Sequence, residues 1–182
     1  MARFAGSGGV RARFRETKQL ALLTAPLETQ GVVVFEPPDR LARHTMRPGR
    51  SSVVVHGSRV AIRDETGHQI LELDEEDPAR HFIDSLAVLL RGDAEALRER
   101  YTVSFQSDET GWKLELEPRS KPLRRMIASI SAGGRGAQLL RMEVRETNGD
   151  SAVTDFFEVE TGLEFDPVEA QRIFSVEDRA GP

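Results

Sequence analysis

A strict alternation of apolar and polar residues in the middle of the chain constrains the fold more than any other feature. Between Tyr101 and Gln106 every second residue is apolar, and the same period of two returns between Trp112 and Glu117. Successive side chains of a β-strand point to opposite faces, so this period predicts two strands that each have one apolar face and one wet face. Such a pattern is typical of an antiparallel sheet.

Short segments of similar character fill most of the rest of the chain. Turn residues separate them, as in His56–Ser58 and Asp64–Gly67, and Asn148–Gly149 is the strongest two-residue hairpin signal. We count about eleven candidate strands, more than a strongly twisted sheet carries without curling. In one of them Leu140, Met142 and Val144 are predicted to share a face. Besides the two strands above, the predicted strands span residues 12–23, 31–35, 41–46, 52–56, 59–63, 69–73, 126–131, 138–146 and 151–161.

One region has helical instead of strand periodicity. Asp77 stands at an N-cap position before Pro78, Gly92 ends the helix, and Asp93 can cap a second short helix. These two helices can cover the concave face of a curled sheet, and a further short helix is expected near residues 168–174. Helical spacing places five apolar residues on one face of the first helix: Phe82, Ile83, Leu86, Leu89 and Leu90.

Composition excludes several classes of function. The net charge of -5 argues against a nucleic-acid or anionic-membrane binder, and the absence of cysteine excludes disulfides, thiol catalysis and cysteine-ligated metal. The four histidines lie in separate segments without metal-site spacing, and no G-x-S-x-G elbow occurs, so no metal, cofactor or catalytic residue is expected. Residues 1–10, rich in glycine, are expected to be a linker or remnant, and residues 11–182 a single domain. No secretory signal is visible, so an exported protein would have had its signal removed.

The first third of the chain carries a series of short motifs. The series is Phe14–Gln19, then Gly31 opening a strand, then Pro38–Arg43, and then residues 52–55 followed by Gly57. It resembles the pattern of the LolA lipoprotein-carrier family. That pattern has an N-terminal strand with an F-x-Q-T-like core, a glycine-led strand, a P-x-x-L-x-R strand, and a strand that ends in a D-G-like turn. The order of elements agrees over most of residues 12–157.

This resemblance implies an incomplete, unclosed antiparallel β-barrel of about eleven strands with a helical lid over an apolar cavity. It implies a monomeric periplasmic carrier that takes acyl chains of a lipoprotein or lipid from an inner-membrane ABC-type donor to an outer-membrane acceptor, without catalysis. Arg43 would be the family's strand arginine, which hydrogen-bonds the lid in the closed state. The expected lipid-binding residues are Phe14, Leu41, Arg43, Phe82, Ile83, Leu86, Leu90, Phe105, Trp112, Leu114, Leu116 and Met142.

The chain departs from the family pattern in two places. Ala42 and His44 flank Arg43 where the family usually has aromatic residues, and the family's longer N-terminal helix is absent or shortened before Phe14. Divergent members of such a family occur beside genes for polyketide-like pigments and glycolipids, so the resemblance leaves a glycolipid or polyene-type lipid as an alternative cargo. A lipid-handling enzyme such as a thioesterase is a second alternative, and a structural or chaperone-like module with a closed, dry core is a third. On that last reading the apolar residues are ordinary core and Arg43 is a solvated strand residue.

Overall fold

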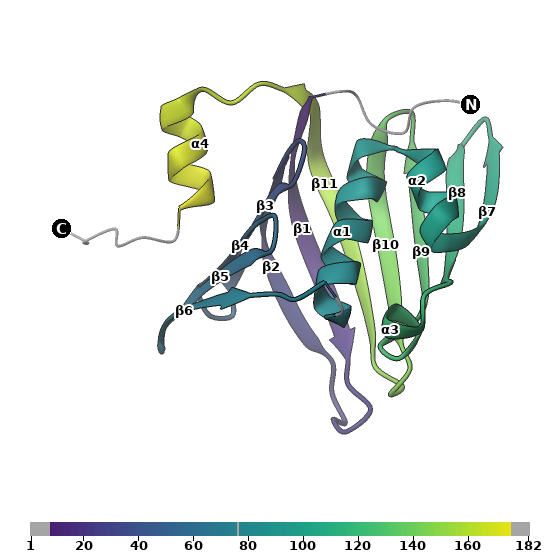
Figure 1. Ribbon diagram of the computed structural model, residues 1–182, viewed down its shortest axis with the longest axis horizontal. Helices are drawn as coiled ribbons and strands as arrows, with labels where there is room; N and C mark the ends of the chain where they lie inside the picture. The colour runs from purple at the N-terminus through teal and green to yellow at the C-terminus, as the bar shows by residue number, and fades with distance from the viewer. Residues whose placement is uncertain (1–7, 76, 176–182) are drawn as a thin grey trace.

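The computed structural model describes residues 8–75 and 77–175, which form one eleven-stranded antiparallel sheet (Figure 1). The strand order is β6-β5-β4-β3-β2-β1-β11-β10-β9-β8-β7. The edge strands β6 and β7 are not paired with each other, so the curled sheet stays open. The predicted unclosed antiparallel barrel is thus confirmed.

The strands agree with the predicted segments except at several ends. β1 stops at Gln19 because the chain turns between Leu20 and Leu23, where the Leu23 amide donates to the Leu20 carbonyl. β2 begins at Leu27, so Gly31 lies inside that strand and does not open it. The strands are β1 Gly9–Gln19, β2 Leu27–Glu36, β3 Arg40–Arg47, β4 Ser51–His56, β5 Arg59–Asp64, β6 Gly67–Glu72, β7 Tyr101–Asp108, β8 Gly111–Pro118, β9 Ile127–Arg135, β10 Gln138–Glu146 and β11 Ser151–Leu163.

β1 also begins earlier than the predicted domain start. Gly9 pairs with Leu163, and Val10 pairs with both Phe35 and Thr161, so these two residues belong to the sheet and not to a linker. Of the rest of the predicted linker, Gly8 is described and lies just before β1, and residues 1–7 lie outside the described residues.

The helices predicted from capping residues begin and end at those residues. In α1 (Pro78–Arg91) the Asp77 side chain accepts a hydrogen bond from the Ala79 amide, and Gly92 ends the helix with a φ of 67°. Asp93 caps α2 (Ala94–Arg100), and Asp166 caps α4 (Pro167–Phe174). The short helix α3 (Lys121–Arg124), capped by Ser120, was not predicted. Among the described residues, no helix is both long enough and apolar enough to cross a membrane.

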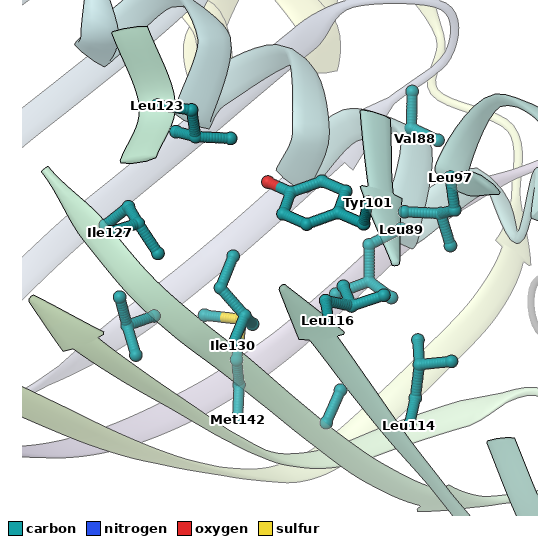
Figure 2. Close-up of a cluster of buried hydrophobic side chains, with 12 residues drawn as sticks. Val88, Leu89, Leu97, Tyr101, Leu114, Leu116, Leu123, Ile127, Ile130 and Met142 are labelled. Carbon is teal, nitrogen blue, oxygen red and sulfur yellow. The ribbon is translucent and has the colours of Figure 1, made fainter. Parts of the chain in front are cut away.

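The main core lies between the helices and one face of the sheet, which we call the inner face. Side chains from α1, α2 and α3 meet those of β7 to β10 (Figure 2). Tyr101 is fully buried there, and Leu116 keeps 1% of its surface exposed. The buried members of this core are Val88, Leu89, Leu97, Tyr101, Leu114, Leu116, Leu123, Ile127, Ile130, Ala132, Met142 and Val144.

The fourth helix packs on the opposite, outer face, beyond β3 (Figure 1). Small residues make room for it, because Ala42 is fully buried and Ala170 of α4 is 6% exposed. Glu169 of α4 forms an ion pair with Arg11 of β1, so α4 also contacts a strand on the far side of β2.

An irregularity in β10 makes one prediction wrong, namely that Leu140 shares a face with Met142 and Val144. The register with β9 shifts between Leu139 and Arg141, so Leu139 and Met142 share the inner face while Leu140 lies on the outer face. Leu140 is accordingly 37% exposed, whereas Leu139 packs against the core. A β-bulge adds one residue to a strand and reverses the alternation beyond it, which a period of two cannot anticipate.

A close approach of β1, β2 and β3 explains the glycine at position 31. A Cβ atom there would lie 2.0 Å from the His44 carbonyl oxygen and 2.9 Å from Cε1 of Phe14. We predict that Gly31→Ala lowers the free energy of unfolding by about 1–3 kcal/mol, the usual cost of overpacking. Urea unfolding checks this. Gly133→Ala is the matched control, since a Cβ atom there would meet its nearest atom at an ordinary 3.5 Å. Equal stability losses in the two variants would contradict the account.

Candidate functional site

An apolar pocket lies between the last turns of α1 and the inner face of the sheet. Of the described residues that line it, Thr161 and Trp112 alone have a polar side-chain atom, and the Trp112 indole N–H already donates to the Gly136 carbonyl at 3.0 Å. The pocket therefore offers apolar contact and little hydrogen bonding. Its lining residues are Val10, Ala12, Val33, Leu89, Leu90, Trp112, Ala137, Leu139, Phe156, Val159 and Thr161.

The pocket is narrow in this conformation. Its cavity volume is about 30 Å³. One water needs about 10–15 Å³ of such space. The pocket therefore holds a few waters and not a long hydrocarbon chain. A chain could enter only if α1 moved away from the sheet.

Apolar packing supplies most of the contact between α1 and the sheet. Val88 and Leu89 are buried, whereas Phe82, Leu86 and Leu90 are half-buried. Beyond this packing, the Arg91 guanidinium donates to the Pro38 carbonyl at 3.1 Å. Apolar contacts are not directional, so an apolar ligand could replace them without leaving polar groups unpaired.

A polar cluster occupies the inner face of β1 to β3 and β11. The Arg43 guanidinium donates to both carboxylate oxygens of Glu16, at 2.9 and 3.0 Å, and to the Thr29 hydroxyl at 3.1 Å. The Thr154 hydroxyl donates to the same carboxylate at 3.0 Å, and Arg43 stacks 4.2 Å above the centre of the Phe14 ring. Arg43 therefore bonds the sheet instead of the carbonyl groups of the lid, which corrects the expected lid contact.

The cluster keeps Glu16 ionised. Burial alone would raise the pKa of its carboxyl group, but the hydrogen bonds and charge of Arg43, together with the Thr154 hydroxyl, hold the pKa below its ordinary value. The bidentate geometry suits guanidinium and carboxylate, and the ring of Phe14 adds a cation–π contact. The result is a charged pair that is satisfied within the sheet.

The structure distributes the twelve predicted lipid-binding residues over several places. Leu90 and Trp112 line the pocket, and Phe14 and Arg43 belong to the polar cluster. Phe105 is 36% exposed on the edge strand β7. Leu41 and Ile83 are half-buried outside the pocket lining. The other five contribute to the main core: Phe82, Leu86, Leu114, Leu116 and Met142.

Sequence reasoning missed most of the pocket lining. Val10 fell within the expected linker, although it shares strand parity with Ala12 and Phe14, a signal that could have identified it. Leu89 lies on the predicted apolar helix face and could have been added on that ground. Val159 and Thr161 follow an irregular part of β11, where parity is lost.

Among the described residues that line the pocket, no nucleophile stands beside a general base. His44 contacts the Ser52 hydroxyl through Nδ1 at 2.9 Å and the Ile173 carbonyl through Nε2 at 3.0 Å, but this pair is on the outer face beneath α4. A chain in the pocket would be separated from it by the sheet. Across the described residues, no three histidine, aspartate or glutamate side chains gather closely enough to hold a metal ion.

This protein is a half-barrel: an unclosed antiparallel sheet with helices packed over an apolar pocket. The sequence matches the family described as outer membrane lipoprotein carrier protein LolA-like over residues 1–158. The chain belongs to this family, which confirms the resemblance noted from the motifs.

Solved structures support the fold. A LolA superfamily protein from Nitrosomonas europaea is similar with a TM-score of 0.50 at 11% identity, covering 93% of this chain and 90% of that one. A DUF1329 family protein from Desulfovibrio piger has a TM-score of 0.50 at 10% identity, covering 92% and 90%. Identities this low show the shared fold alone. Among curated proteins, none matches the sequence.

The polar cluster predicts a defined response to acid. The pKa of Glu16 is lower in the folded state than its ordinary value of 4.5. The folded state therefore binds fewer protons in that window, so the stabilisation is complete above about pH 4.5 and is lost as the pH falls through the folded-state pKa. Glu16→Gln should flatten the acid-side decline in the free energy of unfolding, measured by urea titration at stepped pH.

At neutral pH the same variant should lose about 2 kcal/mol, less than a fully buried pair would, because Arg43 keeps part of its side chain in water. Glu158→Gln is the control, since Glu158 pairs with Arg13 at 3.3 Å but remains 65% exposed. A Glu16→Gln profile parallel to that of the unmodified protein would show that the Arg43–Glu16 pair contributes nothing to acid stability.

Proposed function

We propose that this protein is a non-catalytic carrier that binds the acyl chains of a lipoprotein or lipid beneath α1. The apolar pocket between α1 and the inner face is the observation on which this depends. Membership of the LolA-like lipoprotein carrier family supports the same reading. The described conformation then corresponds to the closed carrier, because the pocket is narrow.

Loading would proceed by exchange of apolar contacts. A sixteen-carbon acyl chain buries methylenes worth about 0.8 kcal/mol each, on the order of 12 kcal/mol in total before losses. Moving α1 exposes Leu89, Leu90 and their partners, and this cost offsets much of the gain. A carrier with such a cost binds reversibly, so the cargo can be passed on.

The proposed route runs through the periplasm, from an inner-membrane ABC-type donor to an outer-membrane acceptor. The family description, which names an outer membrane lipoprotein carrier, supports this route. A glycolipid or polyene-type lipid is the alternative cargo, because the pocket selects a hydrocarbon chain and carries no group that would recognise a particular head group. Of the predicted residues, we propose Leu90 and Trp112 as direct lipid contacts and Phe82, Ile83 and Leu86 as contacts made once α1 opens.

A fluorescent fatty-acid probe tests binding. The probe should brighten on titration into the protein and be displaced by palmitate. Leu90→Gln should weaken probe binding about tenfold, because it removes apolar burial from the pocket. Leu140→Gln, which makes the same change on the outer face, should bind as the unmodified protein does. A probe that stays dark would support the closed, dry core instead.

A transfer assay tests the carrier route. Donor and acceptor vesicles are separated by a membrane permeable to proteins but not to vesicles, and a labelled lipid is followed between them. The protein should move the label, and Leu90→Gln should move less of it in proportion to its weaker binding. Transfer at the rate of a protein-free control would contradict a carrier function, and released free acid would favour the thioesterase.

A further inference from the structure

One end of the barrel brings together three segments that the proposed pocket does not use. The Ala21 amide in the β1–β2 loop donates to the Asp150 carboxylate of the β10–β11 hairpin at 2.8 Å. The Thr147 hydroxyl of that hairpin donates at 2.7 Å to the carbonyl of Arg125, the residue that follows α3. Figure 1 shows the two hairpins and α3 at the same end of the strands. We call residues 20–27, 119–125 and 147–150 the leucine end.

The β1–β2 loop exposes apolar side chains to an unusual degree. Leu22 is 97% exposed, and Leu23 and Leu27 are 43% and 47% exposed. No charged residue occurs from Leu20 to Leu27. A leucine that is almost fully in water adds nothing to the stability of the fold. Its side chain could be buried only against an apolar surface outside this protein.

A cluster of cations lies beside this loop. Arg119, Lys121, Arg124 and Arg125 are all exposed, and no acidic residue interrupts residues 119–125. Within residues 8–75 and 77–175, none of these four has an ion-pair partner. The cluster is unexpected in a chain whose net charge is -5, and it gives this end a local positive charge.

The acidic residues at this end offset the cluster only in part. Glu146 pairs with Lys18 at 3.4 Å, and Asp150 accepts hydrogen bonds from Ala21 and Asn148. Glu75, Asp84 and Glu99 line a pocket together with Ser120 and Leu123, and Asp84 there pairs with Arg80 and Arg100. Glu28, at the start of β2, and Glu117, near the end of β8, are further exposed acids. The exposed cations of residues 119–125 lie outside these ion pairs and can contact an external anion.

We propose that the leucine end docks on the surface of an anionic phospholipid bilayer. Leu22 and Leu23 enter the boundary between head groups and acyl chains, and the cations of residues 119–125 contact the phosphates. A projecting apolar tip flanked by lysine and arginine suits such a surface, because apolar insertion and electrostatic attraction add to one another.

This surface is separate from the proposed lipid pocket. The pocket lies near Val10 and Trp112, close to the starts of β1 and β8, whereas the leucine end lies where β1 finishes and β2 begins. Membrane docking can therefore fail while fatty-acid binding succeeds, and the converse also holds.

Vesicle flotation tests the proposal with the whole protein. It should float with vesicles of equal phosphatidylcholine and phosphatidylglycerol, less with phosphatidylcholine alone, and less at high salt, which screens charge. Leu22→Ser should weaken binding to the anionic vesicles about tenfold. Lys121→Glu combined with Arg124→Glu should weaken it by at least about tenfold.

Matched controls change the same chemistry elsewhere. Val168→Ser removes a 60% exposed apolar side chain from α4, and Arg15→Glu combined with Arg59→Glu makes the same charge change outside the leucine end. Both controls should float as the unmodified protein does, and all variants should bind the fatty-acid probe equally. Failure to bind anionic vesicles would overturn the proposal, and it is the result expected if the loop binds a protein partner instead. Equal losses in the test and control variants would also overturn it.

Discussion

The cover of the inner face by α1 and α2 is the constraint on which the rest of this structure depends. Strand order leaves β6 and β7 unpaired, so the sheet cannot bury its inner face by closing on itself. The helices supply the missing layer, and Leu89 and Leu97 bury themselves against the β7–β10 half. This layer is held mainly by apolar packing, and the proposed carrier function requires the same layer to be displaced.

The inner face is chemically divided along its strands. Toward the starts of β1 and β8 it is apolar and carries the narrow pocket, and toward the end of β1 it carries the Arg43–Glu16 pair. The charged pair is satisfied by neighbouring strands, so it does not need the helices as partners. In the proposed carrier function, movement of α1 would expose apolar surface without breaking this pair, so the sheet would stay intact.

The outer face and the ends of the barrel have different tasks. Small residues such as Ala42 let α4 pack closely on the outer face. The end formed by the β1–β2 loop and α3 presents exposed leucines beside exposed cations. The unclosed barrel thus has helices α1 and α2 on one face, α4 on the other, and an end that we propose contacts a membrane.

Local signals in the sequence determined the antiparallel strands, the capped helices from Asp77 to Arg100, and the family, because periodicity and capping depend on neighbouring residues. The tertiary structure alone decided which side chains meet. The bulge in β10 placed Leu139 on the inner face in place of Leu140. Strand pairing brought Glu16 to Arg43, and the register of β1 placed Val10 in the pocket. These contacts join residues far apart in the chain, and their geometry depends on register and bulges that no short segment encodes.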